Sequence, residues 1–190
     1  MAYCTAADVK TYLGITGAGD DTLIAALVVR AQAMVDRYCN RTFEASSNTN
    51  RTFDAVRDVQ GRVLYLDEDL ASVNTVTNGD ATTVTAAQYV TEPRVTGPFY
   101  ALRLLDSVNI AWTYTTDHEN AITVSGKWAF STSAPADIVH ATIRWAAYLY
   151  RQKDASTFDV TAAPDLGVIT VPQGIPQDVE KLLTPYRKIV

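Results

Sequence analysis

The chain has 190 residues, a length typical of one domain, and 47% of them are hydrophobic while 19% are charged. This balance is typical of a folded globular protein and excludes an intrinsically disordered chain. The net charge of −5 argues against a protein that grips nucleic acid, because such domains are usually basic. An acidic wall is nevertheless suited to nucleic acid that slides past it, because it repels phosphate.

The cysteines and the apolar runs exclude further classes. Cys4 and Cys39 lie far apart and outside any paired motif, so they predict neither a disulfide framework nor a zinc site. The longest aliphatic run, residues 23–29, is too short to cross a bilayer, and we expect no membrane partner. The first residues lack the pattern of a signal peptide, so we expect assembly in a reducing cytoplasm.

A short helix is predicted over residues 5–13. Thr5 is a suitable N-cap, and Asp8 stands three residues later, where its carboxylate can complete a capping box. Gly14 is placed to end the helix, because glycine readily adopts the left-handed conformation found after a last turn.

A longer helix is predicted from Asp20 or Asp21, either of which can cap it, to Cys39. Its apolar residues recur at the spacing of one helical face. They are Leu23, Ile24, Leu27, Val28, Ala31, Met34, Val35 and Tyr38. The face is broad enough for a core helix or for a contact with another subunit, and Leu27, Met34 and Tyr38 are candidates for that contact.

From about residue 50 to 130, Val, Thr and Tyr dominate and turn residues recur, which predicts an antiparallel β meander of five or six strands. The expected strands are residues 62–66, 72–77, 81–90, 99–105, 109–115 and 121–128. We expect the acidic residues 67–69 to break the first of them. Asn78-Gly79 predicts a type I′ hairpin turn, and residues 109–115 are expected to pair with 121–128.

Two more helices are predicted near the C-terminus. Pro135, with Ser133 as cap, begins a helix that runs to about Lys153. Residues 154–175 are expected to form an irregular, flexible linker. A last helix then begins at Pro176 and carries a short apolar stripe.

The predicted fold class is α+β: a bundle of about four helices with an antiparallel β sheet inserted between the second and third. Helical segments cover residues 1–45 and 131–190, and the β-rich insertion covers about 50–130. We expect residues 1–190 to form a single domain.

No motif predicts catalysis, metal binding or a cofactor. Ser125-Gly126-Lys127 lacks the upstream glycine of a phosphate loop and ends a strand, so a turn is the better interpretation. Asp117-His118-Glu119 is expected to be a solvated hairpin tip, and His140 a surface residue. The triplet 67–69 lacks the pattern of a calcium loop. Tyr148 and Tyr150 beside the apolar face of their helix favour packing or subunit contact over base stacking.

Two regions together resemble a known family. ADVKTYLGI followed by DDTLIAALVVRAQAMVDRYCNRTF resembles the N-terminal helix pair of the head–tail connector, or adaptor, family of tailed bacteriophages. SGKWAFS followed by APADIVHATIRWAAYLYRQKD is similar to that family's strand, Gly-x-Trp, proline and long helix. The hairpin region and the closing PQDVEKLLTPYRK fit the longer, β-containing members. The resemblance covers most of the chain, least well residues 154–175.

This resemblance implies a structural virion protein without catalytic residues, assembled in the host cytoplasm and located at the neck of the virion. It implies a ring of identical subunits, twelve in the virion, docked on the portal protein and meeting a tail-side neck or tail terminator protein. Genome DNA would pass through the ring without sequence-specific binding. Residues 126–128 would be a hinge from the sheet into the helices. The alternatives are another neck, tail-completion or baseplate protein, and a small cellular ligand-binding domain.

The C-terminal segment 154–190 is the predicted docking element, mobile alone and ordered against the portal or the next subunit. Its candidate contact residues are Val179, Leu182, Leu183, Tyr186 and Arg187. A helix this short is marginal alone and needs a partner surface. The alternative is that the helix packs on the core of its own subunit. Candidate subunit contacts on the other helices are Leu27, Met34, Tyr38, Tyr148 and Tyr150.

Overall fold

The computed structural model describes residues 2–153, 160–163, 167–170 and 174–188. The chain divides into two compact units. The β unit is the continuous stretch Arg41–Ala134, whereas the helical unit combines Ala2–Asn40 with Pro135–Val190. The described helices and the antiparallel sheet between the second and third of them confirm the predicted α+β class.

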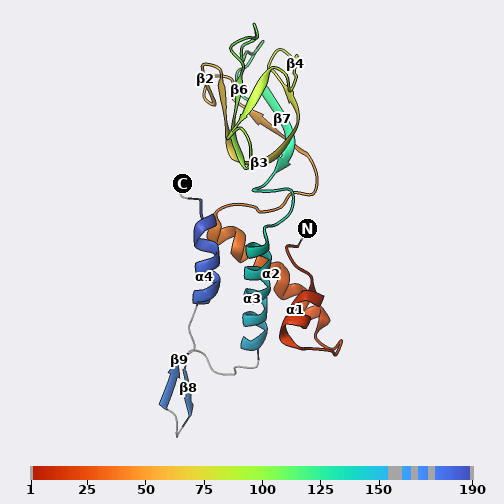
Figure 1. Cartoon of the computed structure of the whole chain (residues 1–190), viewed down its shortest axis with the longest axis vertical. Helices are drawn as coiled ribbons and strands as arrows, with labels where there is room; N and C mark the ends of the chain where they lie inside the picture. Colours follow the sequence, from red (N-terminus) through yellow and green to blue (C-terminus); the bar gives the residue numbers. More distant parts are fainter. Residues whose placement is uncertain (1, 154–159, 164–166, 171–173, 189–190) are drawn as a thin grey trace. The chain divides into compact units, whose positions relative to one another are not determined.

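The described part of the helical unit contains four α-helices, shown in Figure 1. They are α1 (Ala6–Leu13), α2 (Asp21–Cys39), α3 (Ala136–Gln152) and α4 (Gln177–Leu183), and a 3₁₀ turn, Thr184–Tyr186, follows α4. The cap predicted for α1 is confirmed: Thr5 and Asp8 form a reciprocal capping box. Gly14 ends α1 with φ 72°.

The core of the helical unit lies around α3, against which α1, α2 and α4 all pack. The buried residues of α3 follow the helical period, as predicted. They are Ile138, Ala141, Thr142, Trp145, Ala146 and Ala147. Thr142 satisfies its buried hydroxyl by donating a hydrogen bond of 2.8 Å to the carbonyl of Ile138.

Two predicted helix caps are wrong in detail. Asp20 occupies the N-cap position of α2, but its side chain makes no capping hydrogen bond. Its carboxylate instead binds groups near the end of α3. The N-cap of α3 is Pro135, not Ser133. Proline can begin α3 because its missing N–H would have no partner in the first turn anyway.

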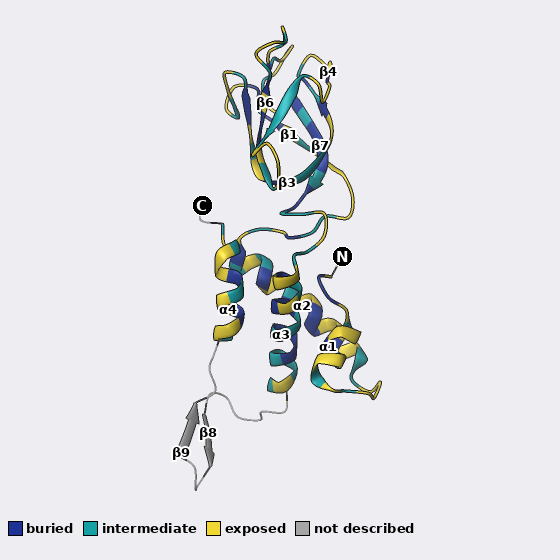
Figure 2. Ribbon diagram, viewed as in Figure 1, coloured by how far each residue is buried: buried dark blue, intermediate teal, exposed yellow. Residues whose placement is uncertain are grey.

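The β unit holds a seven-stranded antiparallel sheet. Its strands are β1 (Thr49–Phe53), β2 (Val59–Gln60), β3 (Val63–Thr77), β4 (Thr83–Val84), β5 (Tyr89–Glu92), β6 (Phe99–Leu104) and β7 (Ile122–Trp128). The main strand order is β1-β7-β3-β6-β5, and β2 and β4 each pair with β3. Buried side chains from the long strands β3, β6 and β7 supply most of its core, as the dark blue segments in Figure 2 show.

The acidic triplet 67–69 does not break the first predicted strand. β3 runs through it, and the register with β6 shifts between Tyr65 and Leu70, which accommodates the extra residues as an irregularity. Arg51 bridges Asp67 and Glu68 at 3.0 and 2.7 Å. The expected strand break is therefore a bend in one long strand, with its charges paired.

The Asn78-Gly79 turn differs from the predicted type I′ hairpin. The backbone N–H of Asn78 donates to the carbonyl of Thr82, so the loop is longer than two residues, and Ala81 has the positive φ of 64°. Gly79 is required for space: a Cβ built there would lie 2.2 Å from the carbonyl oxygen of Thr113. The strand predicted over 81–90 is also divided, with a turn between β4 and β5.

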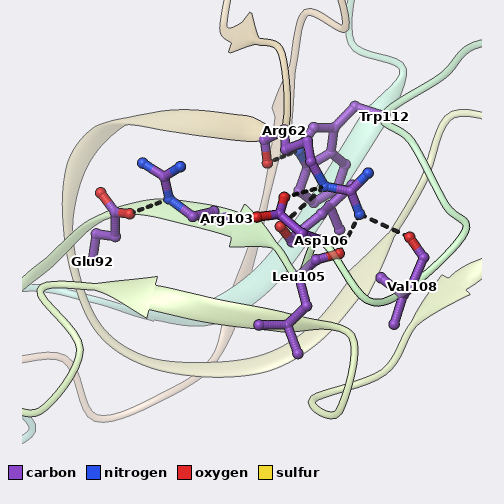
Figure 3. Close-up of polar contacts among 8 residues, drawn as sticks. Arg62, Glu92, Arg103, Leu105, Asp106, Val108 and Trp112 are labelled. Atoms are coloured by element: carbon purple, nitrogen blue, oxygen red, sulfur yellow. Dashed lines mark hydrogen bonds and ion pairs between the residues drawn. The ribbon is translucent and has the colours of Figure 1, made fainter.

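Residues 109–115 form no ladder with β7, contrary to the prediction. The carbonyl of Arg62 accepts hydrogen bonds from the backbone N–H of Leu104 and from the Trp112 indole, at 2.9 and 3.0 Å. The guanidinium of Arg62 donates hydrogen bonds to the carbonyls of Leu105 and Val108 (Figure 3). These contacts hold the segment against the end of β6, where Trp112 is buried in the sheet core.

β7 instead pairs with β1 and β3, and sequence patterning missed β1 because it alternates mostly polar residues. Gly126 lies inside β7, opposite Thr49 on one side and Val73 on the other. The predicted hinge at 126–128 is therefore wrong. A Cβ at Gly126 would lie 2.3 Å from the carbonyl oxygen of Ser72, so the glycine permits two backbones to approach closely.

The expected irregular linker contains regular structure. β8 (Val160–Ala163) pairs antiparallel with β9 (Gly167–Thr170). Flexibility was predicted for the whole of residues 154–175, of which 154–159, 164–166 and 171–173 lie outside the described residues.

Candidate interaction surfaces

Within the described residues, no cluster of His, Cys, Asp and Glu is arranged to hold a metal ion. No described helix is both long and apolar enough to cross a membrane.

His118 is held more firmly than a solvated hairpin tip. Its Nδ1 lies 3.0 Å from a carboxylate oxygen of Asp54, and its ring meets that of Tyr114 edge to face. Backbone N–H groups of Arg57 and Val56 donate to the same carboxylate and, together with His118, lower the pKa of Asp54. The backbone N–H of Ala55 also donates a 2.9 Å hydrogen bond to the carbonyl of His118, so side chain and backbone both join this loop to residues 54–55.

The predicted docking residues divide into two groups. Val179 and Leu183 are 0% exposed in the helical unit, where α4 packs on α3 and α2. Their burial removes them from the docking stripe and agrees with the alternative of a helix packed on its own core. Leu182 and Tyr186 are half-buried and Arg187 is exposed, so these three remain available to a partner.

The end of α4 and the end of α2 form one surface. The Arg187 guanidinium carbon lies 5.6 Å from the centre of the Tyr38 ring, and the Tyr38 hydroxyl donates to Glu180. The backbone N–H of Lys188 donates a 2.8 Å hydrogen bond to the carbonyl of Cys39. Arg187 and Tyr38, predicted separately as docking and subunit contacts, therefore belong to the same patch.

The predicted contact residues of α2 lie in different environments. Leu27 is 7% exposed and belongs to the core, whereas Met34 is 41% exposed. Sequence reasoning named Met34 as a contact but missed Val29, which is 64% exposed on the side of the helix opposite the core. The sequence did indicate this second apolar side, because the apolar residues of α2 cover more of the helix circumference than a single buried stripe does.

Tyr150 is half-buried because it joins the end of α3 to the start of α2. Its hydroxyl donates to the Asp20 carboxylate, which also accepts a 2.9 Å hydrogen bond from Lys153. These bonds, Tyr150 first, lower the pKa of Asp20. The hydrogen bond that Lys153 donates to Asp20 raises the pKa of Lys153 to about 12. Tyr150 therefore has a role inside its own subunit.

Tyr148 lines a small hollow of about 100 Å³ in the helical unit, together with Tyr12, Arg144, Arg151 and Asp178 among others. The Arg144 guanidinium donates to the Tyr12 hydroxyl and to Asp178, so one of the two arginines that line this hollow is already paired. This volume is below the roughly 300–1,000 Å³ of ordinary ligand pockets, so the hollow is too small for a nucleotide or a cofactor.

Comparison with known proteins identifies the family. A family model described as head completion protein matches residues 2–189. No curated protein matches the chain.

Three solved structures share the fold. A chain in the neck of an empty gene transfer agent particle, computed with C6 symmetry, has 14% identity and a TM-score of 0.61, covering 99% of this chain and 91% of that one. A chain in the native neck, computed with C12 symmetry, has 16% identity and a TM-score of 0.59, covering 97% and 88%. A chain of the native virion has 17% identity and a TM-score of 0.60, covering 99% and 91%.

The predicted membership of a phage connector family is therefore confirmed by the family model. The solved structures share the fold of both units. Because the match extends over nearly the whole chain, the chain belongs to the head completion protein family.

Proposed function

We propose that this chain is a head–tail connector subunit that forms a ring in the neck of a virion, between the portal and the tail. The observation that carries the proposal is the head completion protein match over residues 2–189. The shared fold with chains of gene transfer agent necks, one computed with C12 symmetry, supports a ring of twelve. The chain acts through its surfaces and performs no catalysis.

The charge distribution supports passage of DNA without binding. Residues 41–134 contain seven Lys and Arg against eleven Asp and Glu, a net charge of −4. Residues 2–40 and 135–190 contain nine against ten, a net charge of −1. Most of the negative charge thus belongs to the β unit, and a lumen lined by such a surface repels phosphate.

The docking surface of the proposed connector is the patch at the ends of α2 and α4. Tyr38, Leu182, Tyr186 and Arg187 are its half-buried and exposed members. Tyrosine and arginine, which supply three of these four residues, are among the residue types that dominate protein interfaces. Its partner is the portal or a tail-side neck protein.

Deletion of the gene from the producing phage or particle genome tests the proposal. We expect heads that package DNA but carry no tail, and restoration of complete particles when the full chain is supplied from a plasmid. Mass spectrometry of purified wild-type particles should detect the chain in about the copy number of a ring. Complete, tailed particles from the deletion strain would refute a connector role.

A further inference from the structure

We propose that the side of α2 that faces away from its own core is one half of a head-to-tail contact, and that its occupant is the acidic β unit of a second copy of this chain. This inference deepens the proposed function by naming the surfaces that join neighbouring subunits. The outward face of α2 is defined here by Ala26, Val29, Arg30, Ala33, Met34 and Arg37.

These residues recur every three or four positions and so form one stripe along the helix. The opposite stripe, which includes Ile24, Ala31 and Val35, is 0% exposed and forms the core contact. The outward face nevertheless carries Val29 at 64% and Met34 at 41% exposure, with small alanines between them. A solvent-facing helix side normally carries mainly charged and polar residues, so this apolar stripe indicates a covered surface.

The charge on this face identifies what covers it. Arg30 and Arg37 are exposed, and neither forms an ion pair or hydrogen bond with another described residue. No acidic residue of α2 offsets them: Asp21 pairs with Lys10, and Asp36 accepts a hydrogen bond from the Tyr3 hydroxyl. The outward face is thus apolar and basic, and it complements an acidic partner.

A second copy of the chain offers such a partner in its β unit. That unit has a net charge of −4, and several of its acids extend into solvent. Asp80 and Asp117 are exposed and form no ion pair with a described residue. The side chain of Asp106 is 97% exposed, although its carboxylate lies 3.4 Å from Arg62.

The same charges exclude a symmetric pairing of two α2 helices. Placing one outward face on another would bring Arg30 and Arg37 of both copies together, and like charges across an interface are unfavourable. Contact between two different surfaces, the helix of one copy and the β unit of the next, is heterologous, and such contacts generate a closed ring when the rotation between neighbours closes. Attraction between exposed charges also predicts association that weakens with salt.

Photo-crosslinking of the full-length chain tests the proposal. Ala33→Cys places a thiol in the middle of the outward face, and a benzophenone maleimide attached to it reports what lies there. The native Cys4 and Cys39 are buried, and burial raises the pKa of the Cys4 thiol to about 11, so labelling favours the introduced cysteine. Ala7→Cys, at an exposed position of α1, is the matched control.

Mixing ¹⁵N-labelled and unlabelled copies at low salt distinguishes crosslinks between copies from those within one copy. We expect mixed-isotope crosslinks from residue 33 to peptides of residues 41–134, and few from residue 7. Adding Arg30→Glu and Arg37→Glu to Ala33→Cys should lower their yield about tenfold. The melting temperature should stay near that of the parent, because both arginines are exposed.

Three results would overturn the inference: crosslinks from residue 33 to α2 of the other copy, equal yields from residues 33 and 7, or no crosslinks between copies. Each is separable from the proposed function. Particles that contain the chain at their neck but show one of these results would retain the connector role and lose the α2 contact. If the crosslinks form as expected but purified particles lack the chain, the α2 contact would stand and the connector role would be refuted.

Discussion

Arg187 lies with its guanidinium carbon 5.6 Å from the centre of the Tyr38 ring, so the end of the chain is joined to the last turn of α2. The contact is at the surface, because Arg187 is exposed and Tyr38 half-buried. Cations over aromatic rings at such sites stabilise a fold by about 0.5–1 kcal/mol. The pair therefore contributes little to folding and leaves the guanidinium accessible to a partner.

We expect Arg187→Glu to separate docking from stability. The variant should lose at most about 1 kcal/mol of unfolding free energy, because it loses only the ring contact. Complementation of a deletion strain with this variant should nevertheless yield far fewer tailed particles than the wild type. Lys181→Glu, an equal charge reversal at an exposed position of α4, is the control and should complement normally. Equal complementation by both variants would remove Arg187 from the docking surface.

Leu182 and Leu183 were both predicted as docking residues, but the structure places these neighbours in different environments. Leu183 is 0% exposed, so Leu183→Ala should cost about 2–5 kcal/mol of unfolding free energy through lost burial and a cavity. Leu182 is half-buried, and Leu182→Ala should cost about 1 kcal/mol or less. Chemical denaturation of the two full-length variants measures both values. Similar losses for the two would mean that α4 does not bury one face in its own bundle.

The helical unit was predictable from sequence because its signals are local. The Thr5 and Asp8 capping box and the apolar period of α3 each act within a few turns, and they define helices near their observed bounds. The burial of Leu183 was weighed only as an alternative. A short amphipathic stripe looks the same whether its partner is another chain or its own core.

The sheet was less predictable because its pairing is long-range. β1 has the burial pattern of a strand exposed over most of its length, and only its partner β7 makes it a strand. The segment around Trp112 has strand-like composition, yet Arg62 at the start of β3 holds it out of the ladder. Neither effect is visible in local periodicity. Of the outward face of α2, only Met34 was predicted as a contact from the sequence, and the rest was missed because its alanines suggest helix propensity more than contact.

Gly126 should be sensitive to the smallest substitution. In Gly126→Ala the new Cβ would meet the Ser72 carbonyl oxygen, a backbone atom that can move only with β3. Overpacking of this kind costs about 1–3 kcal/mol, and we expect at least that loss in unfolding free energy. Gly17→Ala is the control, since a Cβ there would meet nothing within 4 Å. A stability of Gly126→Ala equal to that of the wild type would show that β3 and β7 do not approach as described.

The Asp20 contacts predict a dependence of stability on pH. Hydrogen bonds from Tyr150 and Lys153 lower the pKa of Asp20 below its ordinary value of 3.8. A carboxyl group with a lowered pKa stabilises the fold above its unfolded pKa, and that stabilisation is lost as the pH falls through the folded pKa. Lys153, with its pKa raised from 10.5 to about 12, contributes fully below pH 10.5. The contacts should therefore be intact throughout the neutral range.

We accordingly expect Asp20→Asn to lower the melting temperature at pH 7 by a small amount, because the carboxylate is exposed and screened by water and salt. The difference between wild type and variant should shrink as the pH falls below 3.8 and should also shrink in high salt. Thermal melts of both proteins from pH 3 to pH 7 measure it. Asp117→Asn is the control, because Asp117 is exposed and bonds to no other described residue, and its melting temperature should match that of the wild type throughout. A difference between wild type and Asp20→Asn that grew toward low pH would contradict the ion-pair role of Asp20.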